Sequence, residues 1–597
     1  MKHSRFFAFF RRFLILLLLL GLVFVAAYFL PFEQTIDFLN SLAPDGEYES
    51  LTGERYQVIS RVSALVGLIL LVSSGFMLAK WTVTQEYISR FFVRVRDFGL
   101  SLREDAKVFL TQSSIARLNK MDRWVILGII LVAVSLRLAS LNFSLTHDEA
   151  YSFNAFASES LWVTVSDYHL PNNHVFLNVI INIFTSFFGD QLWLIRLPTM
   201  IAGVLMVPAA YSAGKRFYGR EVGLLSAGLV AVFPILVLYS VQARGYILMS
   251  LFALLTLYMG DVVREDKNRF AWVLLVVFSA LGFFTIPIML FPFGALYIWL
   301  FLSWLLGDVQ GYDSRFDFLC YWLVSGFASA FLTVFLYLPI LTNNFDRFFN
   351  NDFIAPLERN IFPAVITVRL RNTWFEWVES IPDWLVIVGL VGLVLELILH
   401  FKLSRHKIPQ QVAFLLWIAM YLIARRPDTQ PRMWLFLAAP VLIWSAGGIV
   451  GTLKVLSSPF EKKLPLAQWF VGAAVLAILL FGVWTLPTIP DRLRQKSNLE
   501  NVAVYLAENL REGDMVTAST VFFPQLRYYF NLYGVDPGYL RRSGPFQRVF
   551  IIVGWRNKNT LESEAPKEGA RLAIDLERTS VILQFEEMTV YEAYPAP

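Results

Sequence analysis

The chain is poor in charged residues and has one cysteine. Of its 597 residues, 16% are Asp, Glu, Lys or Arg, whereas an ordinary soluble domain carries about 25%. Because 56% of the residues are hydrophobic and the mean hydropathy is +0.56, we predict an integral membrane protein. Cys320 lies in an apolar run, so the sequence excludes a disulfide framework and a cysteine-based metal site.

The sequence also lacks a phosphate-cradling glycine loop and an internal repeat. Its net charge of +5 comes from short loops between apolar runs. The basic balance therefore reports membrane orientation, and we expect no nucleic-acid partner. The 54 phenylalanines and 17 tryptophans suit lipid-facing helices and interfacial belts.

Long apolar runs are what the chain has instead. A span needs about 20 apolar residues, and thirteen runs are predicted to cross the membrane. They lie near residues 13–30, 58–79, 124–142, 196–213, 222–239, 246–263, 271–287, 289–306, 318–340, 384–400, 410–424, 433–450 and 467–486. The first run follows four basic residues and precedes no A-x-A cleavage site. We therefore expect a retained signal anchor rather than a cleaved signal peptide.

One more apolar run, HVFLNVIINIFTSFFG at residues 174–189, is shorter. Its polar residues His174, Asn178, Asn182 and Thr185 recur at helical spacing and form a narrow stripe. This pattern fits a helix lying in the membrane interface better than one that crosses the bilayer.

Basic residues set the orientation of the spans. The segment 81–123 is rich in lysine and arginine and is predicted to be a cytoplasmic basic linker. If 174–189 does not cross, every lysine between residues 190 and 486 lies on the cytoplasmic side. These lysines are Lys215, Lys267, Lys402, Lys407, Lys454, Lys462 and Lys463. We expect a multi-pass protein of the cell (inner) membrane, with its N-terminus cytoplasmic and its C-terminus extracytoplasmic.

Four parts follow from this topology. An N-terminal transmembrane hairpin (1–80) and the linker precede a transmembrane catalytic core (124–486) and an extracytoplasmic domain (487–597). In the last part, LENVAVYLAENLREG and FPQLRYYFNLYG are predicted to be helices. DMVTAST, RVFIIVG, TSVILQF and MTVYEAY are predicted to be strands. The alternation indicates a small α/β domain.

The outer loops of the core contain arginines but no lysines. These arginines are Arg196, Arg244, Arg347, Arg359, Arg369, Arg371, Arg425, Arg426 and Arg432. Guanidinium groups suit bidentate contacts with phosphate. Four of them, Arg347, Arg359, Arg369 and Arg371, have acids nearby and are expected to form ion pairs with Asp346, Glu358, Glu376 and Asp428. Arg244 and Arg432 lie at the ends of predicted spans, and we predict that they are functional residues rather than partners in structural ion pairs.

The stretch THDEAYSFNAF, residues 146–156, is placed outside by this topology. Thr146 before Asp148 and Glu149 indicates a helix N-cap, which is compatible with catalysis. A carboxylate can act as a base toward an acceptor, and a carboxylate or histidine can hold a divalent metal. Arginines can stabilise a phosphate leaving group. An activated donor on this side is expected to be a polyprenyl-phosphate sugar. Glu159 and Asp167 are expected to be solvated loop charges.

Three segments carry a family resemblance: HDEAY, then YHLPNNHVFLNVI, then the run from RLPTMIAG through KRFYGREVGLL to YSVQARGY. They resemble the GT-C superfamily of membrane glycosyltransferases, in particular the bacterial family 39 or protein O-mannosyltransferase-like members related to the lipid A aminoarabinose transferase. The resemblance is strongest over 121–265 and continues to about residue 450. It implies a polytopic all-α membrane fold with interfacial helices in the first outer loop of the core.

The resemblance also implies residue roles. Asp148 matches the catalytic base, and Glu149 matches its partner, a metal or hydrogen-bond ligand. Gln242 and Arg244 match substrate-facing residues, and Arg432 matches a basic residue near the lipid phosphate. Further candidates for binding the substrate or the lipid phosphate are Asn173, His174, Tyr239 and Tyr246.

A divalent metal cation is a possible cofactor, with Glu149 and His169 as candidate ligands. The chain departs from the family pattern here. Many relatives have His-Pro where this chain has His174-Val175, and a histidine in the outer turn at 283–289, where this chain has none.

The function predicted from these residues is inverting transfer of a sugar from a polyprenyl-phosphate (undecaprenyl- or dolichyl-type) donor to an acceptor protein, lipid or glycan. The alternative is a polytopic transporter or a lipid-linked sugar flippase. Transporters carry ionisable groups and broken helices near the midplane, and here the spans are expected to be nearly free of charge, with Arg137 the main exception. A scaffold that presents residues 487–597 is a third possibility.

Overall fold

The computed structural model describes residues 2–42, 53–141, 145–349, 355–457, 466–485, 498–554, 559–568 and 571–596. The chain divides into two compact units, Met1–Glu104 and Asp105–Pro597, and each is considered by itself.

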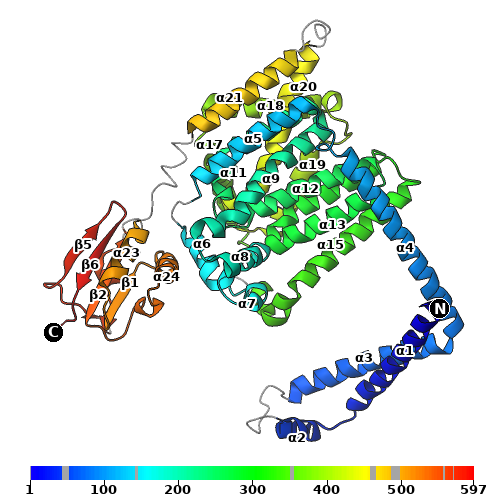
Figure 1. Cartoon of the computed structure of the whole chain (residues 1–597), viewed down its shortest axis with the longest axis horizontal. Helices are drawn as coiled ribbons and strands as arrows, with labels where there is room; N and C mark the ends of the chain where they lie inside the picture. Colours follow the sequence, from blue (N-terminus) through cyan, green and yellow to red (C-terminus); the bar gives the residue numbers. More distant parts are fainter. Residues whose placement is uncertain are drawn as a thin grey trace. The chain divides into compact units, whose positions relative to one another are not determined.

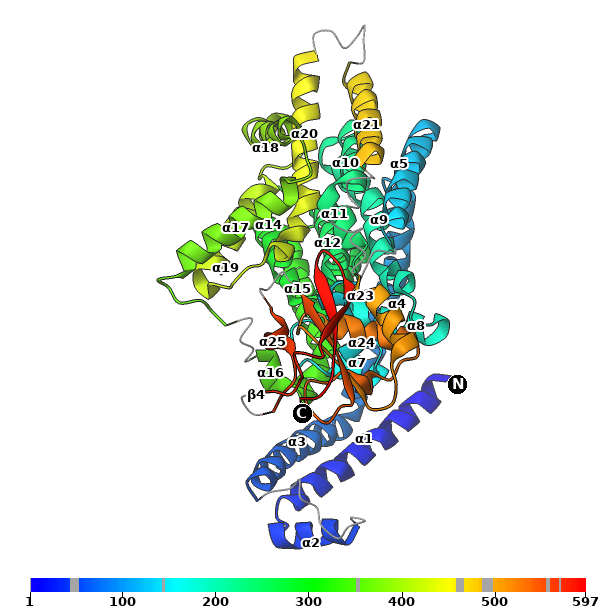
Figure 2. The same ribbon diagram turned by 90° about the vertical axis from the view of Figure 1, so that its left-hand side faces the viewer.

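The described part of the first unit contains four helices, of which two are long and apolar enough to cross a membrane. Its helices are α1 (Lys2–Ala27), α2 (Phe32–Leu42), α3 (Gly53–Ala79) and α4 (Trp81–Gln112), the last of which continues into the second unit. Helices α1 and α3 lie side by side (Figures 1 and 2). A Cβ on Gly21 would lie 2.8 Å from the Gly67 carbonyl oxygen, and the reverse contact is also 2.8 Å. Glycines thus permit the close helix approach common in membranes.

The second unit is a bundle of helices that carries the rest of the predicted spans. Its helices are α5 (Lys120–Ala139), α6 (His147–Ser152), the π-helix η1 (Phe153–Ala157), α7 (Leu161–Ser166), α8 (Val175–Phe188), α9 (Leu192–Tyr218), α10 (Arg220–Val232), α11 (Pro234–Ser240), α12 (Tyr246–Glu265), α13 (Arg269–Thr285), η2 (Pro287–Met289), α14 (Leu290–Leu305), α15 (Arg315–Asn343), α16 (Phe345–Phe349), α17 (Phe362–Val378), α18 (Asp383–Leu403), α19 (Gln410–Arg425), η4 (Pro431–Leu437), α20 (Ala438–Ser457) and α21 (Leu466–Thr485).

Every predicted span lies on a helix, or on a pair of consecutive helices, in one of the two units. Among the described residues, eight helices are long and apolar enough to cross a membrane, and the bent pair α10 and α11 would make nine. The prediction of a mostly helical multi-pass membrane protein is therefore confirmed. The count of thirteen remains a prediction, since helices such as α13 and α19 are shorter than a full span.

The bend between α10 and α11 follows directly from the sequence. The two helices meet at 58°, and Pro234 is the first residue of α11. Proline lacks the N–H that would continue the ladder of α10, yet its fixed φ suits the first turn of a new helix. Helix α11 ends at Ser240. Residues 241–245 then form a short connection before α12.

Helix α8 uses its polar stripe differently from the prediction. Asn182 is buried and donates from Nδ2 to the carbonyl oxygens of Ala157 (2.9 Å) and Glu159 (2.7 Å). Phe187 is 78% exposed. The stripe therefore faces the protein rather than water, because it satisfies backbone carbonyls of the preceding loop, and the aromatic residue at the end of α8 faces outward.

The expectation of nearly charge-free spans is wrong for two helices. Glu396 and His400 of α18 are buried, and so is Asp261 of α12. Glu396 Oε1 accepts the Tyr218 hydroxyl at 2.8 Å and lies 2.7 Å from His400 Nδ1. Such groups are tolerated inside because each has a polar partner on another turn or helix, and single-sequence patterns do not show these partners.

The C-terminal part is a four-stranded sheet packed with helices, together with a separate two-stranded sheet. Its elements are α23 (Leu499–Asn509), β1 (Asp514–Ala518), α24 (Phe523–Leu532), η5 (Pro537–Tyr539), β2 (Arg548–Gly554), α25 (Leu561–Glu564), β3 (Lys567–Glu568), β4 (Arg571–Leu572), β5 (Ser580–Gln584) and β6 (Met588–Ala593). The strand order is β1-β2-β6-β5, with β1 parallel to β2 and the other pairs antiparallel. The predicted helices and strands are all present.

Alternating side chains give this sheet two apolar faces. Phe550 and Ile552 belong to the large core, together with residues of α23 and α24, and Figure 1 shows these helices beside the sheet. Val549 and Ile551 belong to a separate small cluster on the other face. Burial on both faces explains why β2 reads as the continuous apolar run VFIIV.

A glycine contact between α18 and α20 gives a test of the fold. A Cβ on Gly448 would overlap the carbonyl oxygen of Gly392, whereas a Cβ on Gly389 meets nothing within 4 Å. We expect Gly448→Ala to lower the free energy of unfolding by about 1–3 kcal/mol, measured as a lower thermal midpoint in detergent. Gly389→Ala on α18 is the control and should be neutral. Equal midpoints for the two variants would contradict the close contact.

Candidate functional site

The short helix α6 is held at its start by a reciprocal cap. Thr146 Oγ1 accepts the Glu149 N–H at 3.4 Å, and Glu149 Oε2 accepts the Thr146 N–H at 3.0 Å. This capping box confirms the predicted N-cap and satisfies two donors of the first turn. A six-residue helix is not stable alone, so its position depends on the groups around it.

Glu149 is the buried centre of these contacts, with 0% of its surface exposed. Its two carboxylate oxygens accept Arg196 Nε and Nη2 at 2.9 Å each, and Oε1 also accepts the Ala243 N–H at 2.6 Å. Burial alone would raise the pKa of Glu149, but the charge of Arg196 and these hydrogen bonds outweigh it and lower the pKa. Glu149 is therefore an ionised residue that joins α6 to α9 and to the 241–245 connection.

The neighbouring Asp148 points to a different environment. Its side chain is 40% exposed, and it forms ion pairs with Arg244 and with Arg432, whose Nη1 lies 3.5 Å from Oδ2. Partial burial would raise the pKa of Asp148, but the charges of Arg244 and Arg432 lower it below the ordinary value. The accessible face of α6 thus presents a carboxylate between two guanidinium groups.

Arg244 is buried, and its position is fixed by contact with Tyr246 and, through Gly245, by His174. Its guanidinium carbon lies 5.5 Å from the centre of the Tyr246 ring, a cation–π arrangement. The next residue, Gly245, donates its N–H to His174 Nδ1 at 2.9 Å. Burial, and then the charges of Arg244 and Arg432, hold the pKa of His174 well below its usual value. A neutral imidazole can accept this bond, so His174 positions the loop that carries Arg244.

Gly245 is required at this point by close approach. A Cβ there would lie 3.0 Å from the His174 Cβ and 2.9 Å from the Thr285 Cγ2. The turn after α13, where many relatives have a histidine, here places a threonine against the 241–245 connection.

Tyr239 and Gln242 complete the predicted set on this connection. The Tyr239 hydroxyl donates to Glu376 Oε1 at 3.2 Å, and its ring meets the Tyr246 ring edge-on at 5.8 Å. Tyr239 is therefore buried packing next to Tyr246. Gln242 is partly exposed, and within the described part of the chain its side-chain amide has no hydrogen-bond partner, so it is free to contact a bound molecule.

Asn173 and His169 lie outside this cluster. Asn173 is buried and donates from Nδ2 to the carbonyl oxygens of Thr164 (3.1 Å) and Asp167 (2.7 Å). His169 Nδ1 donates to the Asp167 carboxylate at 2.8 Å, and its Nε2 lies 2.8 Å from the Tyr151 hydroxyl. The structure brings together Asp148, Arg244, Arg432 and Gln242, and uses Asn173 and His169 to order the loop beside them.

The candidate metal ligands do not fit a divalent cation. Within the described ranges, no group of three or more His, Cys, Asp or Glu residues is placed to hold a metal. Glu149 is saturated by donors, and both His169 nitrogens have protein partners. Asp148 faces two guanidinium groups, which repel a cation. The metal site predicted on Glu149 and His169 is therefore not supported by this donor arrangement.

The contact of helix α24 with the loop around α6 was not foreseen from the sequence. Its hydrogen bonds are Gln525 Nε2 to the Leu145 carbonyl (2.7 Å), Asn154 Nδ2 to the Pro524 carbonyl (2.7 Å), His147 Nδ1 to the Val521 carbonyl (2.8 Å) and Tyr528 hydroxyl to the Asp190 carbonyl (2.7 Å). The C-terminal domain thus holds residues on both sides of Asp148.

Two arginine predictions can be compared with the structure. Arg369 forms the expected ion pair, with its Nε 2.7 Å from Asp428 Oδ1. Arg347 has no ion-pair partner within the described residues. Arg196 is the residue whose role was missed, because its partner Glu149 lies 47 positions earlier in the chain.

Comparisons with known proteins agree with this architecture. Residues 173–312 match the family model described as dolichyl-phosphate-mannose-protein mannosyltransferase. Apo ArnT from Cupriavidus metallidurans is similar in structure, with 11% identity, a TM-score of 0.51 and coverage of 79% of this chain and 98% of ArnT. ArnT bound to undecaprenyl phosphate has 14% identity, a TM-score of 0.47 and the same coverage of 79% and 98%. A search of curated proteins found no match.

The archaeal oligosaccharyltransferase AglB from Archaeoglobus fulgidus, in complex with an inhibitory peptide and a dolichol-phosphate, has 13% identity and a TM-score of 0.41, covering 73% of this chain and 70% of AglB. The predicted resemblance and the polytopic all-α GT-C fold are confirmed by the family match and by the likeness to apo ArnT. Asp148 and Glu149 precede the matched segment, so their roles rest on the geometry.

The two adjacent acids should respond differently to neutralisation. Glu149→Gln takes the charge partner from the buried Arg196, a change that costs about 3–5 kcal/mol. Asp148→Asn removes a partly exposed carboxylate and should leave the fold intact. We expect folded protein, measured by monodisperse yield and thermal midpoint in detergent, to fall for Glu149→Gln only. A normal yield and midpoint for Glu149→Gln would contradict its structural role.

Proposed function

We propose that this chain is a membrane glycosyltransferase that moves a sugar from a polyprenyl-phosphate donor to an extracytoplasmic acceptor with inversion at the anomeric carbon. The observation that carries the proposal is the pairing of the accessible Asp148 carboxylate with Arg244 and Arg432. Displacement of a lipid phosphate by an acceptor requires a base and phosphate-binding groups close to one another. The GT-C fold and the family match over residues 173–312 support the same reaction class.

In the proposed reaction, the acceptor hydroxyl or amine attacks the anomeric carbon while Asp148 takes its proton. The bond between that carbon and the phosphate oxygen breaks, and its electron pair leaves with the lipid phosphate. Attack opposite the leaving group inverts the configuration. The charge that develops on the phosphate is stabilised by fixed guanidinium groups, which need little reorganisation because Arg244 is already buried and supported.

Donor binding would also activate the base. In the free protein the charges of Arg244 and Arg432 lower the pKa of Asp148, which makes the carboxylate a weak base. A donor phosphate competes for these two arginines. As the phosphate charge offsets that of the two guanidinium groups, the pKa of Asp148 rises, and the carboxylate becomes a stronger base when the donor is in place. Gln242, whose amide has no partner among the described residues, is proposed to contact the same substrate.

The lysine distribution supports an extracytoplasmic site in the cell membrane, and the description of the matching family, which names dolichyl-phosphate-mannose, supports a lipid-linked sugar donor. A transporter or flippase would move the lipid-linked sugar without a covalent product, so an assay that follows both location and product separates the two functions.

Loss of the base is the direct test. Asp148→Asn should lower the transfer rate by about 10²–10⁴-fold without changing the folded yield. Transfer is measured in nanodiscs by mass spectrometry of polyprenyl-phosphate-linked hexoses and pentoses and their products. Glu159→Gln, which neutralises an exposed acid of the same loop, is the control and should keep full activity. Full transfer by Asp148→Asn would refute the role of Asp148, and movement of lipid-linked sugar without product would favour the transporter.

The dependence on pH tests the proposed activation. Because Asp148 must be ionised, activity is present above its pKa and lost as the pH falls through it. The lowered pKa of the free protein predicts that kcat/KM does not fall through this group between about pH 8 and pH 5. In kcat, which reports the donor complex, the acid limb should lie at higher pH than in kcat/KM. An acid limb of kcat/KM near neutral pH that disappears in Asp148→Asn would contradict the proposal.

A further inference from the structure

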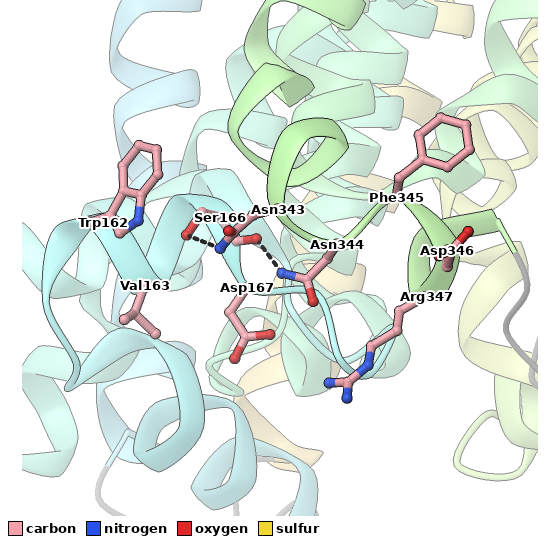
Figure 3. A pocket seen from close by; sticks show the side chains of 9 residues that line it. All are labelled: Trp162, Val163, Ser166, Asp167, Asn343, Asn344, Phe345, Asp346 and Arg347. Atoms are coloured by element: carbon pink, nitrogen blue, oxygen red, sulfur yellow. Dashed lines mark hydrogen bonds between the residues drawn. The ribbon is translucent and has the colours of Figure 1, made fainter. Parts of the chain in front are cut away.

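A pocket of about 530 Å³ lies between α7 and the segment 343–347. It is lined by Trp162, Val163, Ser166, Asp167, Asn343, Asn344, Phe345, Asp346 and Arg347. Its size is within the range of roughly 300–1,000 Å³ that small-molecule sites occupy. The lining residues come from α7, from the end of α15 and from α16 (Figure 3). None of them belongs to the cluster around Asp148.

Direct hydrogen bonds join the two walls of this pocket. Asn344 Nδ2 donates to the Ser166 carbonyl oxygen at 2.8 Å, and Asn343 Nδ2 lies 3.4 Å from Ser166 Oγ. These bonds fix the position of the end of α15 against α7, as Figure 3 shows. The pocket is therefore a built feature of the outer face rather than a gap between loosely placed loops.

Aromatic side chains stand at the two ends of the pocket. Trp162 is 60% exposed and Phe345 is 58% exposed, and Figure 3 shows them on opposite sides of the polar residues. An exposed indole in the loop 143–195 is typical of a membrane interface, and the face of its ring is also a platform for the C–H groups of a bound ring.

The polar groups between these rings are available for hydrogen bonds. Within the described chain, the carboxamide oxygens of Asn343 and Asn344, the Asp346 carboxylate and the Arg347 guanidinium have no hydrogen-bond or ion-pair partner. Acceptors and donors therefore stand side by side in one pocket. Hydroxyl groups, which donate and accept at once, match such a mixture better than a purely anionic or a purely apolar ligand.

The charges that line the pocket restrict the class of ligand further. Two carboxylates, Asp167 and Asp346, line the pocket against one guanidinium, Arg347. This balance does not favour a phosphate, which would meet two like charges, and the polar lining does not favour a lipid chain. A neutral polyhydroxyl ring that stacks on an aromatic face satisfies all three observations.

The pocket is connected to α6, the helix that carries Asp148, by two hydrogen bonds. Asp167, which lines the pocket, accepts from His169 Nδ1 at 2.8 Å, and His169 Nε2 lies 2.8 Å from the hydroxyl of Tyr151 on α6. A molecule held in the pocket would therefore be held in register with Asp148 by a defined chain of contacts.

We propose that this pocket binds a saccharide unit of the acceptor, so that the chain glycosylates a glycan or a glycolipid rather than a bare protein hydroxyl. The proposal rests on the proposed transferase function and specifies its acceptor. Trp162 supplies the stacking face, and Asn343, Asn344, Asp346 and Arg347 bind the hydroxyl groups of the sugar.

Saturation-transfer NMR on the full chain in nanodiscs tests the proposal, with mannobiose, cellobiose, chitobiose and lactose as neutral probes. At least one disaccharide should bind, and Trp162→Ala should weaken that binding by about three- to tenfold, the contribution expected from aromatic stacking. Asn344→Ala, which removes the free amide oxygen, should also weaken it. Trp193→Ala is the matched control, because Trp193 is 45% exposed at the start of α9 and lines no part of this pocket.

The outcomes separate this proposal from the function on which it rests. Binding that persists in Asp148→Asn, while transfer is lost, supports both. Transfer that persists in Asp148→Asn refutes the proposed base and leaves the saccharide site standing. The site is refuted if none of the four disaccharides binds, if Trp162→Ala and Trp193→Ala have equal effects, or if inorganic phosphate or putrescine binds there in preference to every disaccharide.

Discussion

The buried ion pair between Glu149 and Arg196 is the contact on which the arrangement of the segments around α6 depends. It joins α6 to α9, and the same carboxylate accepts the Ala243 N–H of the 241–245 connection. Arg196 Nη1 also donates to the Leu141 carbonyl oxygen at 3.0 Å, at the end of α5. Four segments of the chain, two of them 47 and 94 residues after Glu149, therefore meet at one salt bridge. A buried ion pair is stable only when its remaining hydrogen-bonding capacity is satisfied, and here the backbone of three segments helps to satisfy it.

Two adjacent acids take opposite roles because successive helical residues point in different directions. Glu149 turns into the protein, where it is held as a structural anion, while Asp148 turns toward Arg244 and Arg432 on the accessible side. The inward residue fixes the 241–245 connection, and that connection supplies Arg244. Through this loop, the structural acid also determines where the charge partner of the outward acid lies.

The sequence predicts the parts of this protein that depend on local patterns. Apolar runs identified the helices, alternation identified the C-terminal strands, and Thr146 with Glu149 identified the cap of α6. The partners of the site could not be found in this way, since Arg196 and Ala243 are 47 and 94 residues from Glu149. The same limit applies to Gln525, which binds Leu145 across 380 residues. The hydrogen bonds of His169 and Asn173 lie within the loop 143–195, and a role of these two residues in binding stays a prediction.

Helix α6 shows how a short element can serve several parts of a large protein. His147 binds the C-terminal domain, Asp148 meets the arginines, Glu149 enters the core and Tyr151 meets the histidine that leads to the saccharide pocket. Residues at about 100° intervals point in different directions, so His147, Asp148 and Glu149 diverge, while Tyr151 returns to the face of His147. Because so short a helix has little stability of its own, each of the four contacts helps to set its orientation. The C-terminal domain therefore helps to orient α6, although its own residues contribute no group that touches Asp148 in the described structure. The surroundings of Asp148, its two arginine partners and the hydrogen bonds toward Asp167 are thus all connected through this short helix.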